Sequence, residues 1–216
     1  MESLVELDQQ WLLAINGAHA PWADTLMWYV SQATTWLPLY ALMLVLIWYT
    51  MPKVEADGYE KARLYARLAA FVVAILLFAI AVGGSDLICA RIIKPLVARP
   101  RPTHDPVIGS LVHIVNGYTG GAYGFCSNHA ANTMAAALVF CFIYLPNKKG
   151  IVRLCTIALL TLWVLLNGYS RMYLGVHYPL DILAGWGVGA AMAFVVWWLV
   201  YYLDGRLRRA NPAAKG

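Results

Sequence analysis

Five stretches without a charged side chain, each long enough to cross a lipid bilayer, constrain the fold of this chain more than any other feature. They are residues 34–51, 68–85, 130–147, 154–170 and 182–203. A bilayer core is spanned by about 20 mainly apolar helical residues, with a range of about 17–25. Only 12% of the residues are charged, whereas soluble domains carry about 25%. The pattern therefore predicts an all-α integral membrane bundle of about five to six transmembrane helices, forming a single domain over residues 1–216.

The first 33 residues differ from these spans, because acidic side chains alternate with apolar ones. An amphipathic helix lying on the membrane surface has this spacing. We therefore predict an interfacial N-terminal segment over residues 1–33, in which 24–33 is either a second interfacial piece or an extension of the first span. The apolar positions are Leu4, Leu7, Trp11, Leu12 and Ile15, and the acidic ones are Glu2, Glu6 and Asp8.

The basic residues are distributed in a way that predicts the orientation of the chain. Eleven of the sixteen lysines and arginines fall in three segments that five spans would place on one side of the membrane. The positive-inside rule makes that side cytoplasmic, so we expect the N-terminus outside and the C-terminus inside a bacterial-type inner membrane. This clustering explains the net charge of +5 without a nucleic-acid partner. The residues are Lys53, Lys61, Arg63 and Arg67; Lys148, Lys149 and Arg153; and Arg206, Arg208, Arg209 and Lys215.

The other five basic residues would lie on the outer side, against that rule. Four of them occur in the short stretch "RIIKPLVARPRP", and the fifth is Arg171. A bound polyanion would account for so tight a cluster, and anchoring of helices to lipid headgroups is the alternative. The four are Arg91, Lys94, Arg99 and Arg101.

A second polar segment, "GFCSNHAANTM", precedes the third span and closes a loop predicted over residues 94–126. Ser127 or Asn128 is a suitable N-cap for that span, and His129 would then lie in the first helical turn. The free N–H groups and positive dipole end of a helix bind anions. A capped helix with an interfacial histidine would have the same sequence.

The third segment is "SRMYLGVHYPLD", between the fourth and fifth spans. Pro179 suits the first position of a helix, so His177 would precede that helix and Asp181 would lie in its first turn. A carboxylate four residues on can accept a hydrogen bond from one imidazole nitrogen and direct the other as a nucleophile or base. Two alternatives are a carboxylate that serves only the helix dipole, and a metal pair.

A metal site is not what we expect, because no third and fourth ligands stand at a recognisable spacing. The four cysteines, Cys89, Cys126, Cys141 and Cys155, also lack zinc-site or CxxC spacing.

All three polar segments map to the outer face. Cations, two histidines, an aspartate and a helix N-terminus together match phosphoryl transfer, in which catalysis is mostly positioning and charge stabilisation.

These segments resemble the three-part signature of the type 2 phosphatidic acid phosphatase (PAP2) superfamily. Its first part, lysine, six residues and Arg-Pro, matches Lys94 and Arg101 in "KPLVARPRP". Its second part, usually Pro-Ser-Gly-His, stands here as "CSNH", so Cys126 and Asn128 replace the proline and glycine. Its third part matches Ser170-Arg171, His177 and Asp181 in spacing. The resemblance covers about residues 65 to 200 and implies a PAP2/haloperoxidase-like helical core.

The resemblance also implies the role of each residue and no cofactor or metal. His177 would attack phosphorus, Asp181 would orient His177, and His129 would protonate the leaving oxygen and then activate water. The phosphate would be held by Lys94, Arg101, Arg171 and the N–H groups of Ser127 and Asn128.

The predicted function is therefore the removal of phosphate from a membrane lipid at the extracytoplasmic surface. Candidate substrates are undecaprenyl diphosphate, lipid A phosphate, phosphatidylglycerophosphate and phosphatidic acid. A non-hydrolytic transporter or receptor for anionic lipids, and a phosphotransferase of the same fold, are the alternatives. The sequence does not specify the oligomeric state.

Overall fold

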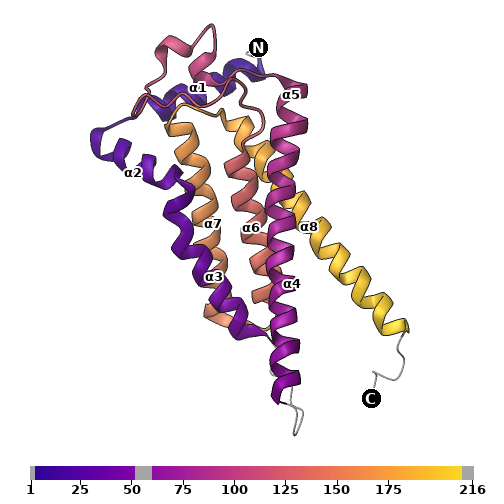
Figure 1. Cartoon of the computed structure of the whole chain (residues 1–216). Helices are drawn as coiled ribbons and strands as arrows, with labels where there is room; N and C mark the ends of the chain where they lie inside the picture. Colours follow the sequence, from indigo (N-terminus) through magenta and orange to yellow (C-terminus); the bar gives the residue numbers. More distant parts are fainter. Residues whose placement is uncertain (1–2, 52–59, 211–216) are drawn as a thin grey trace.

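The structure, a computed structural model, describes residues 3–51 and 60–210 and consists of long helices packed side by side under a cap of shorter ones (Figure 1). Three residues on which the predictions rest, Glu2, Lys53 and Lys215, lie outside the described residues. The long helices are α3 (Leu37–Thr50), α4 (Glu60–Leu87), α6 (Asn128–Tyr144), α7 (Gly150–Tyr173) and α8 (Pro179–Ala210).

The five predicted spans correspond to these five helices. Four helical stretches of the described chain are long and apolar enough to cross a membrane: Ala33–Thr50, Lys61–Val97, Gly150–Tyr173 and Pro179–Leu203. The helix α6 has only 17 residues, but it lies at the centre of the bundle and packs against α3, α4, α7 and α8. Its alanines, among them Ala131 and Ala135, are fully buried, which permits this close packing. The all-α membrane bundle is confirmed.

Two glycines bring α8 unusually close to α6. A Cβ atom on Gly185 would stand 2.5 Å from the carbonyl oxygen of Ser127, and one on Gly189 would stand 2.2 Å from that of Ala131. Small residues allow such backbone approach where lipid provides no hydrophobic drive for association. The contact sets the N-terminus of α8, with Asp181, directly beside the N-terminus of α6.

The helix α4 continues through a π-helical turn, η2 (Ile88–Ile93), into α5 (Lys94–Val97). Lys94 therefore lies on a helix, and the irregular loop begins at Ala98, later than the predicted start at residue 94. Pro95 is the second residue of α5, directly after the π-helical turn, and does not end the helix. Turns of the π type occur frequently at functional sites.

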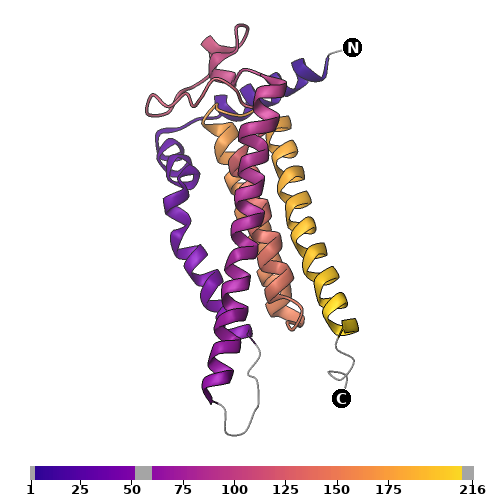
Figure 2. The same ribbon diagram turned by 45° about the vertical axis from the view of Figure 1, so that its right-hand side comes forward.

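The helices α1 (Leu4–Gly17) and α2 (Pro21–Ser31) lie over one end of the bundle, and α8 ends at the other (Figures 1 and 2). A capping box formed by Ser3 and Glu6 begins α1. One detail of the amphipathic prediction is wrong, because Asp8 is only 2% exposed. It faces the bundle and contacts the segment around Asp181.

Candidate active site

His177 and Asp181 form a buried pair at the N-terminus of α8. The Nδ1 atom of His177 stands 3.3 Å from Oδ2 of Asp181. The same carboxylate oxygen accepts a hydrogen bond from the Tyr178 N–H at 3.0 Å. His177 is 1% exposed and Asp181 is 0% exposed, so both orientations are fixed by packing. With Nδ1 turned to Asp181, the other ring nitrogen of His177 is the one that can react.

The electrostatic surroundings keep that nitrogen unprotonated. Burial lowers the pKa of His177 well below its usual range, and the positive charges of Arg101, Arg171 and Lys94 lower it further. The imidazole is therefore neutral at neutral pH. A neutral imidazole has a free lone pair on the nitrogen that does not face Asp181, which a nucleophile requires.

The N-terminus of α6 lies beside this pair. Ser127 is the N-cap, as predicted, and its hydroxyl accepts a hydrogen bond from the Ala130 N–H. Its own N–H donates to the Asp181 carbonyl at 3.0 Å, so the expectation that this N–H is available to a phosphate is wrong for this conformation. The first backbone bond inside the helix is from Ala131 to Ser127. The N–H groups of Asn128 and His129 thus precede the helical ladder and have no acceptor within it.

Asn128 has a role that the sequence did not reveal. Its Oδ1 accepts a hydrogen bond from Lys94 Nζ at 2.5 Å. Its Nδ2 donates to the Asp86 carboxylate at 2.7 Å and to the Asp86 carbonyl at 3.2 Å. The asparagine that replaces the glycine of the signature therefore holds the lysine of the first segment in place, in addition to presenting a backbone N–H.

Arg101 and Arg171 are both buried with their guanidinium groups in the site region. Arg101 donates to the carbonyls of Tyr123 and Val176, and Gly120, at φ +70, leaves the space that its guanidinium fills. Arg171 donates to the Tyr118 hydroxyl at 3.1 Å and contacts the Ser31 hydroxyl. Tyr118 and Ser31 were not predicted, because only the tertiary fold brings them to Arg171.

The predicted residues form one electrostatic cluster. The charges of Arg171, Arg101 and Lys94 act on His129, and His177 is also close enough to interact with it. The charge of Arg101 likewise interacts electrostatically with the charges of Arg171 and Asp181. The structure thus brings the three sequence segments together around His177 and His129, with a surplus of positive charge that suits an anion.

Two further charged residues adjoin this cluster. Arg99 contacts Asp181 through Nη1 at 3.2 Å and Asp8 of α1 through Nη2 at 2.7 Å. The sequence placed Arg99 outside the signature and Asp8 on a surface helix, so this connection was missed. The only available signal was the position of Arg99, two residues before Arg101.

The polar side chains of the loop between α5 and α6 hold this loop against neighbouring elements. Asp105 accepts hydrogen bonds from the Tyr178 hydroxyl at 2.7 Å and from Gln9 at 3.2 Å. His113 contacts the Asp24 carboxylate at 3.0 Å and stacks on His19. These contacts fasten the loop to α1 and α2 over the site.

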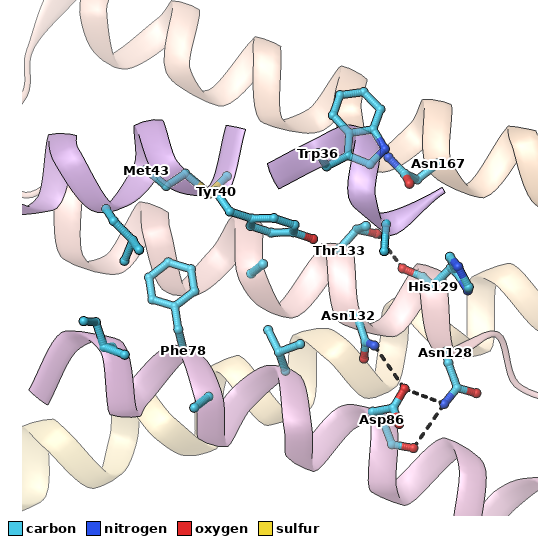
Figure 3. A pocket seen from close by; sticks show the side chains of 16 residues that line it. Trp36, Tyr40, Met43, Phe78, Asp86, Asn128, His129, Asn132, Thr133 and Asn167 are labelled. Atoms are coloured by element: carbon cyan, nitrogen blue, oxygen red, sulfur yellow. Dashed lines mark hydrogen bonds between the residues drawn. The ribbon is translucent and has the colours of Figure 1, made fainter. Parts of the chain in front are cut away.

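An apolar cavity of about 550 Å³ opens between α3, α4, α6 and α7 (Figure 3). Aromatic and aliphatic side chains such as Tyr40, Met43 and Phe78 line most of it. Its polar residues gather at the other end, where Asp86, Asn128, Asn132 and His129 lie (Figure 3). His129 therefore stands where an apolar space meets the cation cluster.

Cys126 and Cys89 are both fully buried, with their sulfur atoms 2.7 Å apart. Cys126 is therefore inaccessible to a labelling reagent in the folded protein. Among the described residues, no three His, Cys, Asp or Glu side chains form a group able to hold a metal ion.

Comparison with known proteins gives consistent results. A family model described as the PAP2 superfamily matches residues 68–204. A "Lipid A 4'-phosphatase" of Bacteroides thetaiotaomicron is 32% identical over 98% of this chain and 85% of its own length. A protein of the same name from Porphyromonas gingivalis is 30% identical over 99% of this chain and 81% of its own length.

A solved structure has the same fold. The crystal structure of a transmembrane PAP2-type phosphatidylglycerolphosphate phosphatase from Bacillus subtilis superposes with a TM-score of 0.63 at 21% identity. The match covers 94% of this chain and 88% of that one. At this identity the likeness establishes the fold.

Proposed function

Because the chain belongs to the PAP2 superfamily, we propose that it is a membrane lipid phosphatase that works through a phosphohistidine intermediate. The observation that carries this proposal is the buried His177–Asp181 pair beneath three cationic side chains. A receptor for anionic lipids would need the cations, but it would not need an imidazole oriented by a carboxylate.

The reaction has two steps. In the first, the ring nitrogen of His177 that faces away from Asp181 attacks phosphorus, and the bond from phosphorus to the lipid oxygen breaks. The departing oxygen takes a proton from His129. Burial and the nearby cations lower the pKa of His129 to about 3, so the negative charge of the bound phosphate would have to offset them for His129 to hold this proton. In the second, His129 accepts a proton from water as that water attacks phosphorus. The phosphorus–nitrogen bond then breaks, which releases inorganic phosphate and restores His177.

The remaining site residues stabilise charge in both steps. Lys94, Arg101 and Arg171 would bind the equatorial phosphate oxygens, on which the transition state carries its charge. The N–H of Asn128, at the start of α6, would supply a further donor. Asp181 would hold the imidazole in one orientation and stabilise the positive charge that develops on it. This scheme uses only side chains, one backbone N–H and water.

The apolar cavity supports a lipid as the substrate. Its polar end holds His129 and Asn128, and its other walls are the apolar side chains of α3 and α4. A phosphate seated among the cations would leave its hydrocarbon tail in this space. The two relatives that match nearly the whole chain bear the name lipid A 4'-phosphatase, so lipid A phosphate is the substrate we favour.

The site would face the extracytoplasmic side of a bacterial-type inner membrane. The turn between α6 and α7, with Lys148 and Lys149, lies at the opposite end of the bundle from α1. The positive-inside rule makes that end cytoplasmic. The substrate would then be a lipid of the outer leaflet.

A phosphate-release panel tests the function. Purified protein in detergent is expected to release inorganic phosphate from lipid A phosphate and more slowly from undecaprenyl diphosphate, phosphatidylglycerophosphate or phosphatidic acid. EDTA should leave the rate unchanged, because the scheme uses no metal. His177→Ala protein purified in parallel controls for contaminating phosphatases. No release from any of these lipids would contradict the proposal and favour lipid binding without hydrolysis.

Filling the cavity tests its role in binding the tail. Ala79→Trp places an indole on the α4 wall and should raise KM for a long-chain lipid phosphate about tenfold, the cost of about two lost methylene contacts. Turnover of a short-chain analogue with the same headgroup should change little. Ala69→Trp, on an exposed part of α4 away from the cavity, is the matched control. Equal KM values in both variants would exclude this cavity as the tail site.

A further inference from the structure

Arg99 occupies a bridging position at the N-terminus of α8. Its Nη1 stands 3.2 Å from Oδ1 of Asp181, and its Nη2 stands 2.7 Å from Oδ2 of Asp8. The guanidinium plane also lies over the Tyr178 ring, with 3.8 Å between Cζ and the ring centroid. Both terminal nitrogens therefore face carboxylates, and one face of the group is covered by an aromatic ring.

The carboxylate of Asp8, which contacts Arg99, is also held in one position. Its side chain is 1% exposed, and its Oδ1 accepts a hydrogen bond from the Leu180 N–H at 2.9 Å. Burial raises the pKa of Asp8, while the Leu180 N–H and the Arg99 guanidinium act against that rise. A buried carboxylate of this kind is costly without its cation, so its presence on α1 calls for an explanation.

The two oxygens of Asp181 have separate partners. Oδ2 faces His177 Nδ1 and the Tyr178 N–H, whereas Oδ1 faces Arg99. The position of Oδ1 sets the rotation of the carboxylate and thereby the aim of Oδ2 at the imidazole. A chain of contacts thus runs from α1 to the reacting histidine through Asp8, Arg99 and Asp181.

We propose that Arg99, held by Asp8 of α1, is a positioning residue that fixes the carboxylate of Asp181 for the orientation of His177. The inference rests on the proposed phosphatase function. Arg99 does not bind phosphate in this arrangement, because its terminal nitrogens are directed at the two aspartates. The helix α1 consequently forms part of the catalytic apparatus, in addition to covering the bundle.

The test separates kcat from KM. Arg99→Gln should lower kcat about 10- to 100-fold, a loss of the size seen when a metal-bound histidine or carboxylate loses its outer hydrogen-bond partner, and leave KM within about threefold. Arg99→Lys keeps a cation near Asp181 and should restore much of the loss. Arg153→Gln changes an exposed arginine near the start of α7, at the end of the bundle away from the site, and should behave like wild type.

Asp8 provides a second test that also guards against misfolding. Asp8→Asn keeps an acceptor for the Leu180 N–H, and it should lower kcat by a smaller factor than Arg99→Gln does. The double variant Asp8→Asn with Arg99→Gln removes the charge of Asp8 together with its cation, and its kcat should be no lower than that of Arg99→Gln alone. Non-additive losses of this kind identify residues that act through one another.

Three results would overturn the inference. If Arg99→Gln raised KM and spared kcat, Arg99 would bind phosphate directly. If Asp8→Asn and Arg99→Gln multiplied their losses in the double variant, Asp8 would act independently of Arg99. If both single variants kept wild-type kcat, the contacts would have no catalytic role. Absence of phosphate release by the wild-type protein itself would instead refute the proposed function.

Discussion

Replacing His177 with alanine is expected to abolish turnover of lipid phosphate, with a loss of about 10⁴-fold or more. Removal of a nucleophile leaves only the contribution of charge stabilisation and binding. The residual cations, Lys94, Arg101 and Arg171, should still bind the substrate, so the loss should fall on kcat. Phosphate release is the measurement, with size-exclusion elution in detergent and thermal denaturation as the checks on folding.

The same experiment can detect the intermediate. Wild-type protein quenched during turnover of a radiolabelled lipid phosphate should carry label that survives alkali and is lost in acid, as expected for a phosphorus–nitrogen bond. His177→Ala and His177→Asn should carry none. The asparagine variant matters because His177 is 1% exposed, and alanine would leave a larger void there. Near-normal turnover by either folded variant would refute the assignment of the nucleophile.

Replacing His129 with glutamine should give the second-largest effect, and one that depends on the leaving group. Glutamine matches the imidazole in size but cannot donate and accept a proton in turn. For a lipid whose leaving group is an alkoxide, loss of general acid catalysis should reduce kcat about 10²- to 10⁴-fold. For an aryl phosphate, whose phenolate departs without a proton, the first step should be nearly unaffected.

Kinetic comparison of the two substrate classes is therefore the decisive measurement for His129. A burst of phenol release by His129→Gln, followed by slow phosphate release, would place the residual defect in the water step. His129 is half-buried and lines the cavity, so the variant should fold like wild type. An equal loss of kcat for the alkyl and aryl substrates would argue against the acid role.

Much of the fold could be predicted because the membrane restricts it. Uncharged runs of bilayer length admit few structures besides helices, and those runs located α3, α4, α6, α7 and α8. The predicted first and last residues of the helices were less accurate than their existence. The loop was predicted to begin at residue 94, yet the π-helical turn of η2 lets the helix continue to Val97.

The site was predictable where its residues are local to one segment. The spacing of His177 and Asp181 and the capping position of Ser127 both follow from helical geometry, and the structure places them accordingly. Contacts between distant segments were not predictable. Asp8 accepts a hydrogen bond from the N–H of Leu180, which lies 172 positions away in the sequence. No periodicity in α1 distinguishes this aspartate from a solvent-facing one.

The contact between α6 and α8 has a consequence for how such a chain can vary. At Gly185 and Gly189 the backbones meet so closely that any side chain would push the two helix ends apart, and with them His129 and His177, which act on one phosphorus atom in the proposed mechanism. The walls of the cavity on α3 and α4 carry no such restriction. If the cavity binds the lipid tail as proposed, exchange of residues such as Met43 and Phe78 would change the lipid preference and leave the distance between His129 and His177 unchanged.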